Sequence, residues 1–393
     1  MKALHFSSSG IRQIVSGVLF AAGMPFAHLP GYIGGALALP SLFEKKSWEE
    51  GRSVFVPLLA FVVYCAITSL FVELPWDALH EVPDALLSWV LPFVAGLSIA
   101  HRREGLFRVY TAAWILLITG SVAAGVGLLP DKWPITIELW GEGMMWALHH
   151  HNDFAASMVI ILPVLLYKSL KTRQWGWWIV TTIVLMGLVL SGSRGYYIAF
   201  VPALLGYMWK EIKTRRVRIY LLSAAMAVFV VLVLTIPGIW TRVAGMISED
   251  QSITSRINSL RVTGWIVTEH PLIGLGPGQL VNHPEYLEKA ASMGLFIDTQ
   301  PGRMKHLHNV YATMAAECGL IGLALFLWAL MALAVRLRRG DAMSRALFWG
   351  YIGFLVGNLF DSQLLGPSAG MDFFFLAGLF FPHLDEVSPG DSS

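Results

Sequence analysis

Charged residues are scarce in this chain. Asp, Glu, Lys and Arg make up 14% of its 393 residues, hydrophobic residues make up 55%, and the mean hydropathy is +0.61. Soluble globular proteins contain about 25% charged residues. The composition therefore excludes an ordinary soluble domain and predicts a protein that is embedded in a membrane.

Cysteine and metal-ligand patterns are also scarce. Cys65 and Cys318 are the only cysteines, which excludes a disulfide framework and a cysteine-based metal site. No Asp-x-Asp pattern occurs, and the three consecutive histidines at 149–151 cannot all face one ion from a helix. We expect no metal and no cofactor.

The apolar N-terminal stretch lacks a convincing cleavage site, so we expect an uncleaved first span.

Apolar stretches near the length of a membrane helix recur along the chain. They predict an all-α polytopic membrane protein with about 12 transmembrane helices and one large extracytoplasmic helical loop. We expect transmembrane helices 1–9 within residues 1–239, the large loop at 240–318, transmembrane helices 10–12 within 319–384 and a cytoplasmic tail at 385–393. The spans are expected near residues 11–25, 29–43, 54–72, 86–100, 106–129, 154–170, 175–190, 196–209, 219–239, 320–335, 346–360 and 371–381.

Basic residues determine the expected orientation. Most of the 28 Lys and Arg residues lie in the N-terminal segment or in loops that follow even-numbered spans, as in the run 210–218. The positive-inside rule then places both ends in the cytoplasm and the loop 240–318 on the opposite side. Each basic run adjoins a predicted span, which favours a topological anchor over a nucleic-acid patch. We expect membrane lipids as partners and no nucleic acid.

A break between two spans contains an arginine among small residues. Residues 191–195 read Ser-Gly-Ser-Arg-Gly, and the topology places Arg194 on the extracytoplasmic side. The side chain can extend to lipid headgroups, or its planar guanidinium can bind a phosphate or diphosphate through two hydrogen bonds. Both interpretations remain open at this point.

The large loop contains a polar stretch that is typical of a surface helix. Arg261 and Trp265 are four residues apart and share a helical face, with Arg256 on a neighbouring part of it. Helix solubility and interfacial anchoring of Trp265 would explain each residue singly. The glycines at 274–278 lack the strand, turn and helix of a dinucleotide-binding fingerprint, so we reject that interpretation.

A histidine follows where the chain enters the next span. His308 is followed by Asn309 and Tyr311, and then by Glu-Cys-Gly-Leu-Ile-Gly at 317–322. A histidine at the aqueous end of a membrane helix costs free energy unless it has a partner, and it titrates near physiological pH. It is either a hydrogen-bonded interfacial residue or a functional group.

The order of these motifs resembles the bacterial O-antigen ligase and polymerase superfamily. The likeness consists of Ser-Gly-Ser-Arg-Gly between spans, Arg-x-x-x-Trp and His-Pro-Leu-Ile-Gly-Leu-Gly in a large loop, and then His-Asn-x-Tyr with Glu-x-Gly-Leu-x-Gly. It covers roughly residues 144–325. The resemblance implies a GT-C-like glycosyltransferase architecture in the bacterial inner membrane, with the active site facing the periplasm. Overall length and layout are closer to the ligase.

The resemblance implies an activity and a set of site residues. A ligase transfers O-antigen polysaccharide from undecaprenyl diphosphate to a sugar hydroxyl of the lipid A–core oligosaccharide in lipopolysaccharide biosynthesis. Arg194 and Arg261, with Arg256 assisting, would bind the diphosphate without a metal. His308 would act as general base or would orient the diphosphate. A single displacement would invert the anomeric centre. The substrate cavity would also be lined by His151, at the start of the sixth span with Asn152 and Asp153, and by Trp265, Asn309 and Tyr311.

Other activities remain open at the level of sequence. A polymerase or a protein O-oligosaccharyltransferase of the same superfamily would use the same kind of donor with a different acceptor. A transporter of polyprenyl-linked glycan belongs to another class, which usually places charges at mid-membrane in broken helices, often with an internal repeat. Here the distinctive charges gather on one side and no repeat is visible, which counts against a transporter. A membrane scaffold is the remaining possibility.

Overall fold

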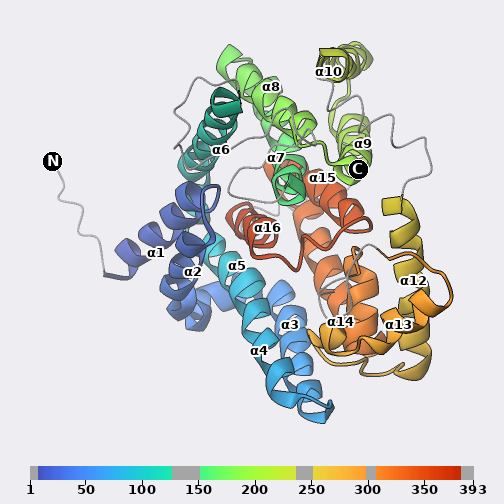
Figure 1. Cartoon of the computed structure of the whole chain (residues 1–393). Helices are drawn as coiled ribbons and strands as arrows, with labels where there is room; N and C mark the ends of the chain where they lie inside the picture. Colours follow the sequence, from blue (N-terminus) through green and yellow to red (C-terminus); the bar gives the residue numbers. More distant parts are fainter. Residues whose placement is uncertain (1–7, 126–150, 236–250, 298–306, 382–393) are drawn as a thin grey trace.

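The computed structural model describes residues 8–125, 151–235, 251–297 and 307–381, and within these ranges it contains helices and no strand. This confirms the predicted all-α class. Figure 1 shows the helices gathered into one bundle. Their bounds are α1 Ser8–Val18, α2 His28–Ala38, α3 Lys45–Thr68, α4 Pro75–Ala85, α5 Leu91–Ser98, α6 Arg103–Gly125, α7 His151–Thr172, α8 Trp175–Leu190, α9 Arg194–Glu211, α10 Arg215–Thr235, α12 Gln251–Glu269, α13 Glu285–Ser292, α14 Val310–Arg339, α15 Ala342–Gly357 and α16 Pro367–Leu379.

The apolar segments predicted from the sequence overlap these helices. The helices themselves differ in length. Four segments of the described chain are long and apolar enough to cross a membrane: Lys45–Phe71, Ala100–Ala123, His151–Thr172 and Val310–Arg339. They make the chain a multi-pass membrane protein. Helix α8 and the segment Ser368–Leu379 are apolar but shorter. The expected number of about 12 spans therefore stays a prediction.

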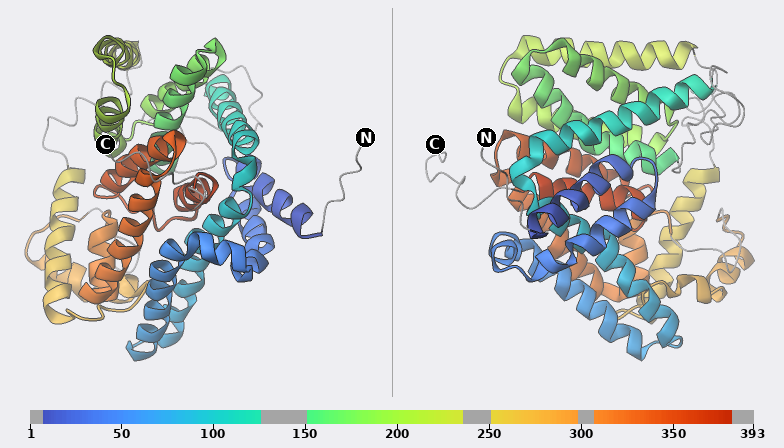
Figure 2. Two further views of the ribbon diagram at one scale, coloured as in Figure 1. Left: turned by 180° about the vertical axis from the view of Figure 1, so that it is seen from behind. Right: turned by 90° about the vertical axis from the view of Figure 1, so that its left-hand side faces the viewer.

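Helix α7 lies at the centre of the bundle. Every residue from Phe154 to Leu166 is buried, and the helix packs against α8, α9 and α15 (Figures 1 and 2). Helix α15 approaches it closely at a glycine, since a Cβ atom on Gly350 would lie 2.1 Å from the carbonyl oxygen of Ile160. Membrane helices gain packing energy from such small-residue contacts.

Helix α14 is two helices joined at a glycine. Gly319 has φ 66° and ψ −174°, which no right-handed helix contains. The glycine-rich loop of residues 271–278 occupies this break: the amide of Leu275 donates to the carbonyl of Ala316 at 2.9 Å, and that of Gly276 donates to the carbonyl of Glu317 at 2.8 Å. The glycine-rich loop thus donates hydrogen bonds to the last carbonyls of the first helix, which have no partner within that helix. The break lies where we expect the loop 240–318 to end.

The predicted large loop is itself helical where the structure describes it. Helices α12 and α13 lie beside the first part of α14 (Figure 2). They share a small hydrophobic cluster that is separate from the main core. Its buried members include Val262, Ile266, Leu280, Leu287 and Leu307. Residues 240–250 and 298–306 lie outside the described part.

The two cysteines meet at the break in α14. Both are buried and free, and their Sγ atoms are 3.9 Å apart, which joins the end of α3 to the residue before Gly319. The hydroxyl of Tyr64, next to Cys65, donates to the carbonyl of Cys318 at 2.8 Å and to that of Leu272 at 3.0 Å. These contacts fix the position of the first part of α14.

Gly350→Ala tests the close approach of α7 and α15. The added methyl group would collide with backbone atoms that cannot rotate away, so we expect it to lower the free energy of unfolding by about 2 kcal/mol. Gly176→Ala is the control, because a Cβ atom at Gly176 has no described heavy atom within 4 Å. We expect that variant to be neutral or slightly more stable. Thermal unfolding in detergent measures both, and equal stability of the two variants would contradict this packing.

Candidate functional site

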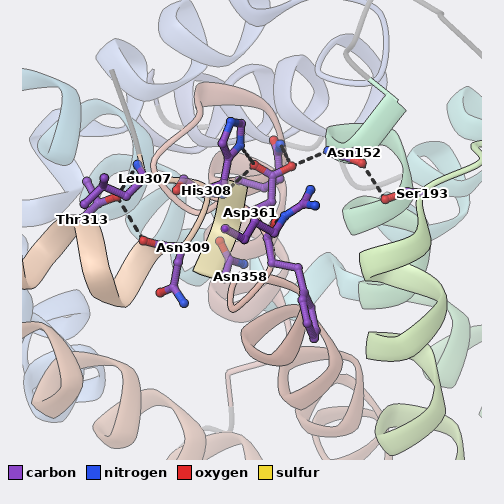
Figure 3. Close-up of polar contacts among 12 residues, drawn as sticks. Asn152, Ser193, Leu307, His308, Asn309, Thr313, Asn358 and Asp361 are labelled. Atoms are coloured by element: carbon purple, nitrogen blue, oxygen red, sulfur yellow. Dashed lines mark hydrogen bonds and ion pairs between the residues drawn. The ribbon is translucent and has the colours of Figure 1, made fainter. Parts of the chain in front are cut away.

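The carboxylate of Asp361 is the centre of a polar cluster. It lies in the loop between α15 and α16, and its side chain is 12% exposed. The amide of Ser362 donates to Oδ1 at 2.8 Å, and Gln363 Nε2 donates to Oδ2 at 2.9 Å. Asn152 Nδ2 also donates to Oδ2, and the Nδ1 atom of His308 lies 3.6 Å from Oδ1 (Figure 3). Four groups from three parts of the chain therefore face one charge.

Asn152 connects this carboxylate to the small-residue break between α8 and α9. Its Oδ1 atom accepts a hydrogen bond from Ser193 Oγ at 2.5 Å (Figure 3). Ser193 precedes the first residue of α9, and its amide donates to Ser191 Oγ at 3.2 Å. The Ser-Gly-Ser-Arg-Gly motif is thus tied to the Asp361 loop through one carboxamide in the first turn of α7.

Asp361 provides a fixed negative charge. Burial opposes its ionisation, but the contacts with His308, Gln363 and the Ser362 amide outweigh burial and hold its pKa below its usual value. A depressed carboxyl pKa contributes stability above the ordinary titration range of aspartate, near pH 4, and this contribution is lost only as the pH falls through the lowered pKa. At neutral pH the carboxylate is ionised.

The backbone of His308 is held in an unusual conformation. Its φ of 51° falls in the left-handed region, which costs a non-glycine residue about 1–3 kcal/mol. The neighbours on both sides are fixed: the amide of Leu307 donates to Thr313 Oγ1 at 3.1 Å, and Asn309 caps α14. The imidazole is 46% exposed and turns Nδ1 toward Asp361. Its Nε2 atom has no hydrogen-bond partner among the described residues.

Two predicted arginines lie at the Asp361 loop. Arg256 on α12 donates from Nε to the carbonyl of Phe360 at 2.8 Å. Arg194 is the first residue of α9, between Ser193 and Gly195. A Cβ atom on Gly195 would lie 3.0 Å from Phe360 Cβ, so the start of α9 is in contact with the same loop. Arg256 and His308 therefore contact this loop, and the start of α9, which carries Arg194, lies beside it.

The second loop arginine lies differently. Arg261 is exposed, and its described hydrogen bond, a long one of 3.5 Å, goes to Asn258 of its own helix. Five residues rotate a helix by about 140°, so Arg256 and Arg261 cannot point the same way. We expected Arg261 to be the more important of the two. The structure instead gives Arg256 the contact with the Asp361 loop.

The remaining predicted residues have structural contacts. Trp265 packs in the cluster of α12 and α13, with Lys289 Nζ 4.9 Å from the centre of its ring. Asn309 accepts from the amides of Tyr311 and Ala312, and the Tyr311 hydroxyl donates to the carbonyl of Leu355 at 2.9 Å. His151 begins α7, next to Asn152. The other two histidines of the triplet lie outside the described residues.

Asp361 itself was absent from the sequence prediction. A signal for it exists, because Asp361 and Asp372 are the only carboxylates in the apolar stretch 346–381. A carboxylate in such a stretch is costly and usually marks a functional position. The described residues contain no group of three or more His, Cys, Asp or Glu side chains placed to hold a metal ion. The cationic groups at this site are instead guanidinium groups.

Comparison with known proteins agrees with the geometry. No curated protein matches the chain. Residues 179–327 match the family described as O-antigen ligase. The matched segment runs from α8 into α14 and includes Arg194, Arg256, Arg261 and His308. This part of the chain is therefore similar to the O-antigen ligase family.

Proposed function

We propose that this protein is an O-antigen ligase that transfers the polysaccharide from undecaprenyl diphosphate to a sugar hydroxyl of the lipid A–core oligosaccharide. The observation that carries the proposal is the contact of Arg256 and His308 with the Asp361 loop, beside the start of α9 that carries Arg194, in a chain of which residues 179–327 match the ligase family. The polytopic helices fit a lipid-linked donor. The site would face the periplasm of a cell whose inner membrane holds the protein.

His308 is the group that we assign to proton transfer. Asp361 holds the Nδ1 side of the ring, so Nε2 is the nitrogen that remains for the acceptor. A positioned base of this kind contributes about 100-fold to 10,000-fold to a rate. The strained backbone of His308 fits such a role, because strain of this size is usually kept where function requires one orientation.

The arginines are the groups that we assign to the diphosphate. A guanidinium group binds phosphate oxygens with two parallel hydrogen bonds and stays charged at any physiological pH. Arg194 and Arg256 come from different helices and would hold the diphosphate from two sides. They would stabilise the negative charge that grows on the leaving group, and stabilisation of this kind contributes more to the rate of many transfer reactions than any other effect.

The proposed reaction is a single displacement. The oxygen of the acceptor hydroxyl attacks the anomeric carbon, and the bond between that carbon and the diphosphate oxygen breaks with its electron pair on the diphosphate. The hydroxyl proton passes to His308 Nε2. Attack from the side opposite the leaving group inverts the anomeric centre. The activated donor supplies the free energy, so the reaction needs no nucleotide.

A polymerase or a protein O-oligosaccharyltransferase of the same superfamily would use the same donor chemistry with another acceptor. Lipopolysaccharide from a deletion strain separates the possibilities. Loss of a ligase leaves bare core while polyprenyl-linked polymer accumulates. Loss of a polymerase leaves single repeat units on the core, and loss of a transporter leaves the donor on the cytoplasmic side.

Transfer by the purified protein is the direct test of the function. We expect full-length protein in detergent or nanodiscs to move glycan from a synthetic polyprenyl diphosphate to lipid A–core, and the rate to stay within about two-fold after addition of EDTA, since arginines supply the positive charge. The product should have the inverted anomeric configuration, which NMR reports. Retained configuration would contradict the single displacement, and loss of activity with EDTA would contradict the role of the arginines.

Asp361→Asn tests the pairing of Asp361 with His308. The variant keeps the size of the side chain and removes its charge, so the ring loses its fixed orientation. We expect kcat of Asp361→Asn to fall about 100-fold with little change in the KM for donor or acceptor. We expect kcat of His308→Ala to fall at least as far. Asp77→Asn, on the exposed start of α4, is the matched control. Wild-type kcat in the Asp361 variant would remove this residue from the mechanism.

Arg256→Ala and Arg261→Ala form a matched pair on one helix. Because Arg256 contacts the Asp361 loop and Arg261 is exposed, we expect Arg256→Ala to lower kcat/KM by about 100-fold to 1,000-fold and Arg261→Ala by less than about ten-fold. The rate of transfer from the polyprenyl diphosphate donor measures both. The opposite order would show that Arg261 is the residue that binds the diphosphate.

A further inference from the structure

A cavity lined by both apolar and carboxyl side chains lies next to the Asp361 loop, and none of its lining residues is an arginine. Its volume is about 100 Å³. Leu365, four residues after Asp361, is one of its walls, and the carbonyl of the preceding Leu364 accepts a hydrogen bond from Trp89 Nε1 at 2.9 Å. The other walls come from α3, α4, the segment between α4 and α5, the glycine-rich loop and the first part of α14, and include Phe61, Glu81, Asp84, Trp89 and Glu317.

Glu317 is the buried carboxyl group of this cavity, and the backbone amides of Gly278 and Leu280 interact with it. Its side chain lies among the cavity walls, the residue is only 4% exposed, and its Oε1 atom has no hydrogen-bond partner in the described part of the chain. A buried polar atom without a partner costs free energy, so native proteins keep one only where something else satisfies it. The backbone of Glu317 is held in place, because its carbonyl accepts a hydrogen bond from the Gly276 amide.

The glycine-rich loop brings a second carboxylate to the same cavity. Gly278 has φ 68°, and a Cβ atom there would lie 2.3 Å from Cγ of Glu81. Glycine at 278 therefore allows Glu81 to approach the loop. Asp84 lies one turn further along α4 and is exposed at the rim. The cavity thus has a buried carboxylate at its base and two at its edge.

Aromatic side chains form another part of the cavity wall. The rings of Phe61 and Trp89 are stacked, with centroids 5.6 Å apart and an angle of 29° between planes, and the bond from Trp89 to Leu364 fixes their position. The carboxyl oxygen of Glu317 that lacks a partner can accept a hydrogen bond, so a ligand with donor groups can satisfy it. Hydroxyl groups at its edge and an apolar face toward the rings meet both requirements, and a sugar ring has both.

We propose that this cavity binds a sugar ring of the acceptor glycan. The inference rests on the proposed function, because it assigns the acceptor to a position beside the Asp361 loop. Charge separates the two substrates: Arg194 and Arg256 lie where an anionic diphosphate would bind, whereas the exposed carboxylates of Glu81 and Asp84 would repel it. The cavity binds the acceptor glycan, which is rich in hydroxyl groups. The Asp361 loop adjoins both the cavity and Arg256, and Asp361 itself positions His308.

Glu317→Gln tests this assignment, with Asp84→Asn as a second variant at an exposed position where folding is not at risk. The carboxylate hydrogen bond to a sugar hydroxyl is weakened in both, so we expect the KM for lipid A–core to rise about ten-fold in Glu317→Gln and less in Asp84→Asn. The KM for the donor and the melting temperature should not change. Glu288→Gln, on the exposed face of α13, is the matched control.

Calorimetric binding of core oligosaccharide, without donor, separates this inference from the proposed function. Weaker binding to Glu317→Gln than to wild type and Glu288→Gln supports the cavity as an acceptor site. Equal binding to all three, or a rise in the donor KM alone, overturns it. Failure of the wild-type protein to transfer glycan would count against the ligase activity, while binding of the oligosaccharide would still test the cavity.

Discussion

The structure depends on one buried charge. Asp361 stays ionised within the bundle only because donors from separate parts of the chain surround it, since an unpaired buried carboxylate would cost several kcal/mol. Its partner Asn152 is 209 residues away in sequence and carries Ser193 with it. The need to satisfy this carboxylate therefore joins α7, α9, the α15–α16 loop and the start of α14. Those elements are the ones that bring Arg194 and His308 together.

A second constraint acts on the backbone. The break at Gly319 divides α14 into two parts. The first part begins just after His308, and the second is a long apolar helix. The glycine-rich loop fills that break and covers its free carbonyls. The same loop sets Glu317 and Glu81 beside each other, so it serves the proposed acceptor cavity as well as the fold. Guanidinium groups at Phe360 and carboxylates at the cavity beside Leu365 would attract donor and acceptor to different positions.

Local sequence predicted the positions of the helices better than the contacts between them. Apolar runs located most helices closely, including α8, and motif order pointed to Arg194, His308 and a loop arginine. The preference for Arg261 over Arg256 stays a prediction, because spacing to Trp265 describes one helix face, while the direction of that face depends on how α12 packs. A carboxylate in an apolar stretch was a local signal for Asp361, but its contacts with Asn152 and His308 could not be predicted, because these partners lie far away in sequence.

The central claim is that the diphosphate lies between Arg194 and Arg256, with the Asp361-oriented imidazole of His308 beside the reacting carbon. A cryo-EM structure of the full chain with a non-hydrolysable polyprenyl diphosphate analogue measures this directly. The account predicts guanidinium groups from α9 and α12 on the diphosphate oxygens and Nδ1 of His308 still facing Asp361. A diphosphate bound away from both arginines, or a His308 ring turned away from Asp361, would contradict it.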